Sequence, residues 1–191
     1  MLDNKHWFKR ELCAAGFATP PFITWNMAQG PFEPASSARF KRAFPGYDGP
    51  FVVKPAVGRA SLNVHVVDDA ARLPSVIEEV FAASKTTVLV EEYMPGREYV
   101  VAASGPITAR GRRLFAGDEP FVFGAQERVL ARAERIFTSM DVAPITKERV
   151  RAIDPAADGA IRAELYALAD AIYREFGLSS LVRLDVRADA K

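Results

Sequence analysis

One stretch, from Phe51 to about Tyr99, constrains the fold more than any other part of the sequence. It contains three short runs rich in β-branched residues, at 51–55, 63–67 and 87–92, and such runs are typical of β-strands. A turn of small residues at 58–61 separates the first two runs. A segment with apolar residues at helical spacing, from Leu73 to Phe81, separates the second run from the third. We therefore expect three strands and a helix that packs on their sheet.

The charged residues of this stretch stand where its predicted strands end. Lys54 closes the first strand beside the small-residue loop, Glu91 and Glu92 end the third, and Glu98 follows a Pro-Gly turn. A fixed cation beside free backbone N–H groups is an arrangement that holds phosphates. Carboxylates on a nearby strand could hold the amino and hydroxyl groups of a nucleoside. In outline this is a nucleotide site, and a strand-end lysine that points into water is the alternative for Lys54.

Length and composition set the broad class. A chain of 191 residues can bury a core as one domain, or as one domain in two lobes. The formal charge of +1 gives no basic field for a nucleic-acid partner, and the single cysteine excludes an intramolecular disulfide. The sequence has no 18-residue apolar run and no signal-peptide pattern, so we expect no membrane association and a cytoplasmic location.

The spacing of apolar residues and the capping and turn residues predict further helices and strands on both sides of this stretch. They are a helix from Asp3 to Gly16, an extended segment at 22–25, a helix from Ser36 or Ser37 to Phe44, strands at 99–103 and 181–186, a strand or hairpin within 107–123, and a helix at 161–176. Residues 124–150 are harder to interpret. Residues 125–133 are expected to form a helical turn or two, and residues 134–138 a strand.

Two charged residues share one face of the last predicted strand. The alternation of residues 182–186 places Arg183 and Asp185 together, with the apolar residues on the opposite face. The pair could be a simple ion pair. Facing a phosphate site, it would instead suit a phosphate contact and a Mg²⁺ ligand, because Mg²⁺ prefers hard oxygen ligands.

Taken together, these pieces resemble the ATP-grasp superfamily, and within it the D-alanine–D-alanine ligases. The resemblance lies in four pieces in order: the opening residues 3–20, the strand 51–55 with its loop, the run 90–98, and the segment from Gly177 to Val186. It implies an α+β ATP-grasp fold, with two α/β lobes whose mainly antiparallel sheets hold ATP between them. The first domain would comprise residues 1–94, with the smaller lobe from about residue 20, and the second lobe would comprise residues 95–191.

The resemblance also implies a role for each site residue and ATP and Mg²⁺ as cofactors. Lys5 and Lys54 would contact the ATP phosphates, and a loop at 58–63 would close over them, with Ser61 matching a serine of the family's pattern. Glu91 would take the adenine amino group, beside Glu92 and the backbone of Tyr93 and Met94, and Glu98 would hold the ribose hydroxyls. Arg183 would stabilise the transferring phosphoryl group, and Asp185 would bind Mg²⁺. The reaction would phosphorylate a carboxylate, and the amine of an amino acid or peptide would then attack the acyl phosphate.

The chain also departs from the family pattern. The loop reads Gly-Arg-Ala-Ser-Leu-Asn, where the ligases have more glycine and serine, although Asn63 tolerates a left-handed backbone. The family's further phosphate-contacting lysine finds no match within 124–150. The Glu-x-Asn pair that completes the family's metal site and the substrate-binding N-terminal domain also find no match. We therefore expect a segment of a longer ligase or a degenerate gene product, and no catalysis by this chain as it stands.

Three alternatives stay open at this stage. The chain could be an ATP-grasp ligase for another amino acid or peptide, or a nucleotide-binding module without catalysis. It could also be a structural or interaction domain, in which Lys54, Glu91 and Glu98 are ordinary surface charges and Lys5 is a solvated lysine. Neither the acceptor amine nor the oligomeric state can be derived from these residues.

Overall fold

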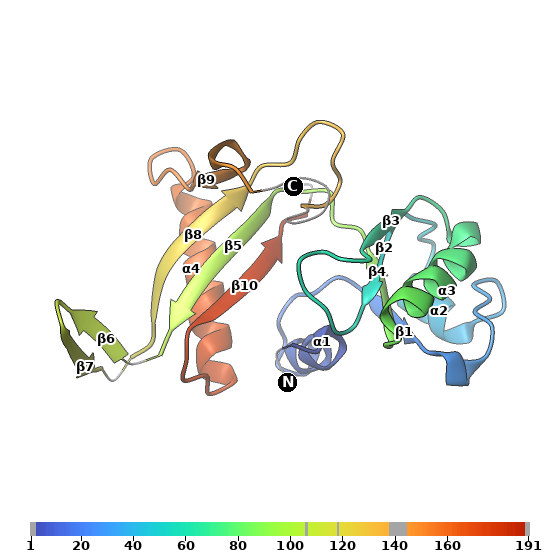
Figure 1. The fold of residues 1–191 in the computed structure, drawn as a ribbon, viewed down its shortest axis with the longest axis horizontal. Coiled ribbons are helices and arrows are strands. Elements are labelled where there is room, and N and C mark those ends of the chain that lie inside the picture. The colour runs from blue at the N-terminus through green and yellow to red at the C-terminus, as the bar shows by residue number, and fades with distance from the viewer. Residues whose placement is uncertain (1–2, 106, 118, 138–144, 190–191) are drawn as a thin grey trace. The chain divides into compact units, whose positions relative to one another are not determined.

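The computed structural model describes residues 3–105, 107–117, 119–137 and 145–189 (Figure 1). The chain divides into two compact units, and the polypeptide passes from one to the other between Met94 and Pro95. The helices and strands of the first unit are α1 (Lys5–Ala14), β1 (Phe22–Trp25), α2 (Ala38–Ala43), β2 (Phe51–Pro55), β3 (His65–Val67), α3 (Leu73–Ser84) and β4 (Val88–Glu92).

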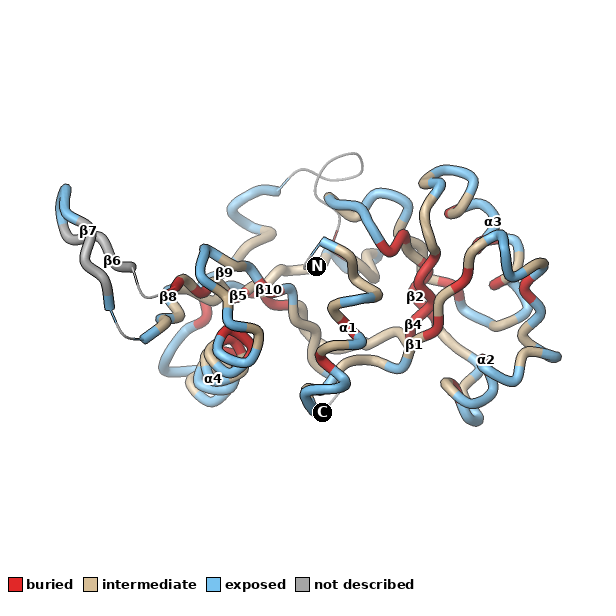
Figure 2. The backbone as a smooth tube through the Cα atoms, turned by 90° about the horizontal axis from the view of Figure 1, so that it is seen from below, coloured by how far each residue is buried: buried red, intermediate tan, exposed pale blue. Residues whose placement is uncertain are grey.

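The first unit is a four-stranded antiparallel sheet with helices on both faces. The strand order is β1-β4-β2-β3, so β4 and β2 are the central pair. Helix α1 lies on one face of this sheet, and α2 and α3 lie on the other (Figures 1 and 2). Because side chains alternate along a strand, β2 and β4 each present one set of residues to α1 and the other set to α3.

The α2/α3 side of the sheet holds the larger core. The predicted stripe of α3 is confirmed, because Leu73, Val76, Ile77 and Val80 are buried. They pack with residues of the central strands and with a group of aromatic rings from β1, α2 and the segment that leads to it. Figure 2 shows this buried backbone running through the central strands.

The second unit is built on a separate antiparallel sheet. Its elements are β5 (Glu98–Ser104), β6 (Ile107–Arg110), β7 (Arg113–Ala116), β8 (Phe121–Arg128), β9 (Val150–Ala152), α4 (Gly159–Glu175) and β10 (Val182–Arg187). The strand order is β10-β5-β8-β9, and α4 covers one face of this sheet (Figure 1). Strands β6 and β7 pair only with each other, as the hairpin expected within 107–123.

Strand alternation decides which residues of the second unit reach its core. Tyr99, Val101 and Ala103 of β5 are buried, and Tyr99 packs in a cluster with Leu165 of α4. The residues between them on β5, beginning with Glu98, belong to the other face of the sheet. That second face carries the charged groups considered below.

Most of the predicted elements are confirmed, with three corrections. The first helix is capped by Asn4, whose side chain accepts a hydrogen bond from the Trp7 N–H, and not by Asp3. Residues 125–128 belong to strand β8 and not to a helical turn, because pairing with β5 outweighs the helix propensity of their side chains. Residues 134–137 form no strand, and the last residue of that predicted strand, 138, lies outside the described residues. None of the helices in the described ranges is long and apolar enough to cross a membrane.

Candidate functional site

A buried carboxylate shared by two lysines lies on the α1 side of the first unit's sheet. Glu91 stands on β4 and is only 7% exposed. One of its carboxylate oxygens accepts from Lys54 of β2, and the other lies 3.0 Å from the ammonium of Lys9 on α1. We call these three residues the Glu91 cluster. The register of β2 and β4 explains why Lys54 and Glu91 meet. Glu91 is paired with Val52 across the two strands, and Leu89 with Lys54, so these four side chains lie on the same face of the sheet.

Burial acts on both acid and base in this cluster. Burial alone would raise the pKa of Glu91, but Lys54 and Lys9 together outweigh it and hold that pKa below its usual value. Burial lowers the pKa of Lys9, and Glu91 opposes this effect in part. A buried carboxylate is stable only when it is paired, and here two cations share one anion. The cluster therefore carries a net positive charge in the folded unit.

The Lys5 side chain and the loop at 58–63 meet at the start of α1. The Lys5 ammonium donates to the carbonyl oxygen of Gly58 at 2.8 Å, and the Lys5 backbone N–H donates to the carbonyl of Ala56. Asn63 adopts the left-handed backbone that asparagine tolerates, with φ at 55°, and Ala60 and Ser61 adopt the same region. Such angles are uncommon for alanine and serine, and the Lys5 ammonium holds the start of this loop through Gly58.

The end of β4 carries the residues that were predicted to border the adenine. The N–H of Glu92 donates to the carbonyl of Pro21, and the N–H of Tyr93 donates to the carbonyl of Pro50, each at 3.0 Å. These bonds anchor the chain just past the sheet, while the side chains of Glu92, Tyr93 and Met94 stay partly exposed. The segment is therefore fixed in place and accessible at its surface.

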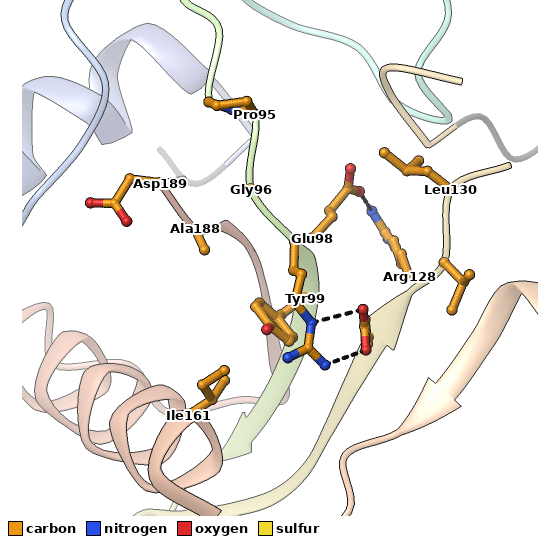
Figure 3. Close-up of a pocket in the computed structure, with 12 residues that line it drawn as sticks. Pro95, Gly96, Glu98, Tyr99, Arg128, Leu130, Ile161, Ala188 and Asp189 are labelled. Carbon is orange, nitrogen blue, oxygen red and sulfur yellow. Dashed lines mark hydrogen bonds and ion pairs between the residues drawn. The ribbon is translucent and has the colours of Figure 1, made fainter. Parts of the chain in front are cut away.

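In the second unit an arginine joins two of the predicted site residues. Arg128 of β8 donates to Glu98 at 2.8 Å and approaches the carboxylate of Asp185 on β10 at 3.4 Å. Its guanidinium carbon also lies 5.0 Å from the ring centre of Phe137. Figure 3 shows Glu98 and Arg128 pointing toward each other above the strands. We call Glu98, Arg128 and Asp185 the Arg128 cluster.

Two more arginines flank this cluster on β10. Arg183 pairs with Asp185 at 3.2 Å, and Arg187 approaches Glu98 at 3.6 Å. The predicted alternation is confirmed, since Arg183 and Asp185 are exposed while Leu184 is buried. Three arginines thus surround two carboxylates on the face of the sheet that α4 leaves open.

A cavity of about 540 Å³ adjoins the Arg128 cluster, lined by residues of the second unit that include Glu98, Arg128 and Tyr99 (Figure 3). Arg97 lies over the Tyr99 ring and clamps Glu127 with two hydrogen bonds of 2.9 and 2.6 Å. Burial raises the pKa of Tyr99, whose hydroxyl is buried and has no hydrogen-bond partner within the described part of the chain. Two charged residues in the wall of this cavity, Arg97 and Glu127, are therefore paired with each other.

Few of the described side chains are placed so that they could bind a metal ion. Within the described ranges no three acidic, histidine or cysteine side chains cluster so as to hold a metal by themselves. A Mg²⁺ ion that accompanies a nucleotide needs fewer protein ligands. It takes one or two carboxylates from the protein, and phosphates and water supply its other ligands. Asp185, half-exposed beside Arg183 and Arg128, fits that requirement.

The structure brings together some predicted residues and adds two that the sequence did not indicate. Lys54 and Glu91 meet in the first unit, and Glu98 and Asp185 meet through Arg128 in the second. Glu91 is not an ordinary surface charge, as one alternative required. Lys9 was missed, although its spacing of three residues from Leu12 places both on one helical face. Arg128 was missed because it becomes a neighbour of Glu98 only once β8 pairs with β5.

Comparisons with known proteins point to one family. The model of the D-ala D-ala ligase C-terminus family matches residues 12–191. The D-alanine–D-alanine ligase of Lacticaseibacillus casei (strain BL23) is 33% identical over 96 residues, which are 50% of this chain and 24% of that protein.

Two solved structures share the fold over nearly the whole chain. The VanG D-Ala:D-Ser ligase from Enterococcus faecalis superimposes with a TM-score of 0.70 at 23% identity. The D-alanine–D-alanine ligase from Bacillus anthracis complexed with ATP superimposes with a TM-score of 0.64 at 18% identity. Each match covers 98% of this chain and 49% of the other, so the chain spans about half the length of these ligases. The expected α+β ATP-grasp fold is confirmed.

Proposed function

We propose a function from one premise, which is that this chain belongs to the D-ala D-ala ligase C-terminus family. The proposed function is that of an ATP-dependent carboxylate–amine ligase acting on amino acids or peptides, with this chain as its ATP-binding part. We also propose that this part consists of two lobes, which comprise residues 1–94 and 95–191. A cytoplasmic location, where ATP is available, belongs to the same proposal.

The phosphates of ATP are proposed to bind beside the Glu91 cluster. Lys54 is the cation closest to solvent in that cluster, with 21% of its side chain exposed, against 9% for Lys9. Lys5 already bonds Gly58 at the start of the loop at 58–63, so it can hold the loop and approach the same anion. Ser61, in that loop, is proposed to contact the phosphates as the loop covers them.

The nucleoside is proposed to bind at the end of β4 and at Glu98. Glu92 and the backbone of Tyr93 and Met94 would border the adenine. Glu91 is proposed to stand next to the adenine amino group, although Lys9 and Lys54 occupy both of its oxygens in this structure. Glu98 would accept from the ribose hydroxyls, and Arg128, which pairs with it, would fix its orientation.

The reaction itself is proposed to depend on charge neutralisation. A substrate carboxylate oxygen attacks the γ-phosphorus and releases ADP, and an amine nitrogen then attacks the acyl carbon, forming the C–N bond and releasing phosphate. Arg183 and Arg128 would neutralise the charge that develops on the transferred group, and alignment would supply the rest of the rate enhancement. Asp185 would hold Mg²⁺, which supplies further positive charge to the phosphate oxygens.

One observation carries the proposal: the net positive, buried Glu91 cluster stands beside a loop with a defined backbone. Calorimetric titration with Mg²⁺–ATP tests it. Lys54→Ala should weaken binding by roughly 1.5–3 kcal/mol, the range of a charge-assisted hydrogen bond. Lys41→Ala, an exposed lysine of α2, is the matched control and should bind as the wild type does. An unchanged dissociation constant for Lys54→Ala would overturn the phosphate role.

Turnover is tested separately, by ADP release in the presence of Mg²⁺–ATP and candidate amino acids such as D-alanine and D-serine. ADP formed only when an amino acid is present supports ligation. Saturable ATP binding with no ADP under any of these conditions would instead assign this chain to nucleotide binding without catalysis.

A further inference from the structure

We propose that Lys9 is a positioning residue, the fixed counterion of Glu91, which lets Lys54 leave that carboxylate for a phosphate. This inference rests on the proposed function, because it assigns a role to Lys9 within the same phosphate site. Lys9 was missed by sequence reasoning, yet it is among the few buried charged residues that the structure describes.

The surroundings of Lys9 fix it in place. Its ammonium lies 3.0 Å from a carboxylate oxygen of Glu91 and donates to the hydroxyl of Thr19. It also lies 5.0 Å from the ring centre of Phe22, in cation–π range. Contacts from a loop and two strands therefore hold this ammonium, and only 7% of the residue is exposed.

Lys54 differs from Lys9 in its exposure to solvent. It stands at the end of β2, next to the loop at 58–63, and a fifth of its side chain reaches solvent. Its contact is with the other oxygen of Glu91. Of the two lysines, Lys54 is thus the one that can turn toward an incoming anion.

The charge balance explains why two lysines are needed. If Lys54 alone paired with Glu91, its departure would leave a buried carboxylate without a cation, which is strongly unfavourable. With Lys9 in place, Glu91 stays paired after Lys54 leaves. The cluster thus presents its surplus positive charge to the phosphate without breaking the last buried ion pair.

The test measures binding of inorganic tripolyphosphate, which carries no adenine, to the full chain by calorimetry. Lys54→Met should weaken binding at least 10-fold. Lys9→Met should weaken it about 3- to 10-fold, because Glu91 then retains Lys54. Lys41→Met, on the surface of α2, is the matched control and should leave the affinity within about 2-fold.

Removing the carboxylate distinguishes positioning from a merely structural role. In Lys9→Met/Glu91→Gln no carboxylate holds Lys54, so binding should return to within about 3-fold of the wild type. Glu91→Gln alone should bind tripolyphosphate more tightly than the wild type, since neither lysine is neutralised. Far-UV circular dichroism and tryptophan fluorescence, compared with those of the wild type, show whether each variant is folded. If Lys9→Met does not fold, the Glu91→Gln result decides alone.

The outcomes separate this inference from the proposed function. Unchanged binding by Lys54→Met would overturn the phosphate site itself. Weakened binding by Lys54→Met, with no effect of Lys9→Met or no rescue by Glu91→Gln, would overturn only the role of Lys9. Weaker binding by Glu91→Gln alone would also overturn that role, because it would show that the carboxylate supports the anion site directly.

Discussion

Among the described residues, each unit has a buried glutamate that is shared by two cations, and the two cases differ in the kind of cation. Glu91 in the first unit is shared by Lys9 and Lys54. Glu127 in the second is shared by Arg97 and Arg151. Both glutamates are among the buried charged residues of the described chain, and both have a pKa below the usual value. Hydrogen bonds from Arg97 are the main cause for Glu127. For Glu91, burial is the largest single effect and raises the pKa, but the two lysines together outweigh it.

The difference between lysine and arginine separates a structural site from an exchangeable one. Arg97 donates to Glu127 with one edge of its planar guanidinium. With another edge it donates to Asp158, at the start of α4, at 2.9 and 3.1 Å. Such a fork is lost if the arginine moves. A lysine ammonium is a compact charge on a flexible stem, so it can exchange one anion for another. We therefore expect Glu127 to stabilise its unit, whereas Glu91 belongs to the proposed phosphate site.

The largest expected effect is that of Glu127→Gln on the stability of the second unit. Breaking a fully buried ion pair costs about 3–5 kcal/mol. Because Arg97 keeps Asp158 and Arg151 is mostly exposed, we expect a loss of about 2–4 kcal/mol in the free energy of unfolding.

The two units can be followed separately in this experiment. Both tryptophans, Trp7 and Trp25, belong to the first unit, so their fluorescence reports on that unit, whereas far-UV circular dichroism reports on both. In urea, Glu127→Gln should lower the midpoint seen by dichroism and leave the fluorescence midpoint unchanged. An equal shift of both midpoints would contradict the assignment of this glutamate to the second unit alone.

A smaller effect is expected for Arg97→Lys, which keeps the charge and removes the fork. We expect a loss of about 1–2 kcal/mol, the lower part of the range for charged hydrogen bonds, because a third of the Arg97 side chain is exposed. Arg151→Lys is the matched control on the same carboxylate. Its side chain is 59% exposed, so its loss should stay below about 1 kcal/mol. Equal losses by the two variants would show that charge alone, and not the fork, stabilises Glu127.

The sequence indicated the strands and long helices because their signals are local. The spacing of Leu73, Val76, Ile77 and Val80 is a property of one helix, and it identified the buried face of α3 correctly. Residues 125–128 were misassigned because their helix propensity is local, whereas the pairing that makes them a strand comes from β5.

The candidate site was predictable only where a residue carried its own signal. Lys54 and Glu91 stood out as charges at strand ends, but their partner Lys9 is 45 or more residues away and reads as an ordinary helix lysine. Arg128 is likewise joined to Glu98 and Asp185 by the register of three strands and by nothing in its own segment. The structure shows which of these residues meet, but the ligand-binding roles of all the predicted site residues stay predictions until ligand binding is measured. These residues are Lys5, Lys54, Ser61, Glu91, Glu92, Tyr93, Met94, Glu98, Arg183 and Asp185.

The smallest expected effect is on acid stability, and it compares the two glutamates directly. Because the folded pKa of each lies below the unfolded value of about 4.3, each contributes stability that is fully present above that pH and is lost as the pH falls through the folded pKa. Between pH 7 and 5 neither contribution should change. Below about pH 4, each should fall by at most about 1.4 kcal/mol per pH unit. Glu127→Gln should flatten the acid dependence of the dichroism midpoint and leave that of tryptophan fluorescence intact. Glu91→Gln should flatten the acid dependence of the fluorescence midpoint. A Glu91→Gln variant whose fluorescence midpoint keeps the full acid dependence of the wild type would show that the two lysines do not hold this carboxylate in its charged form.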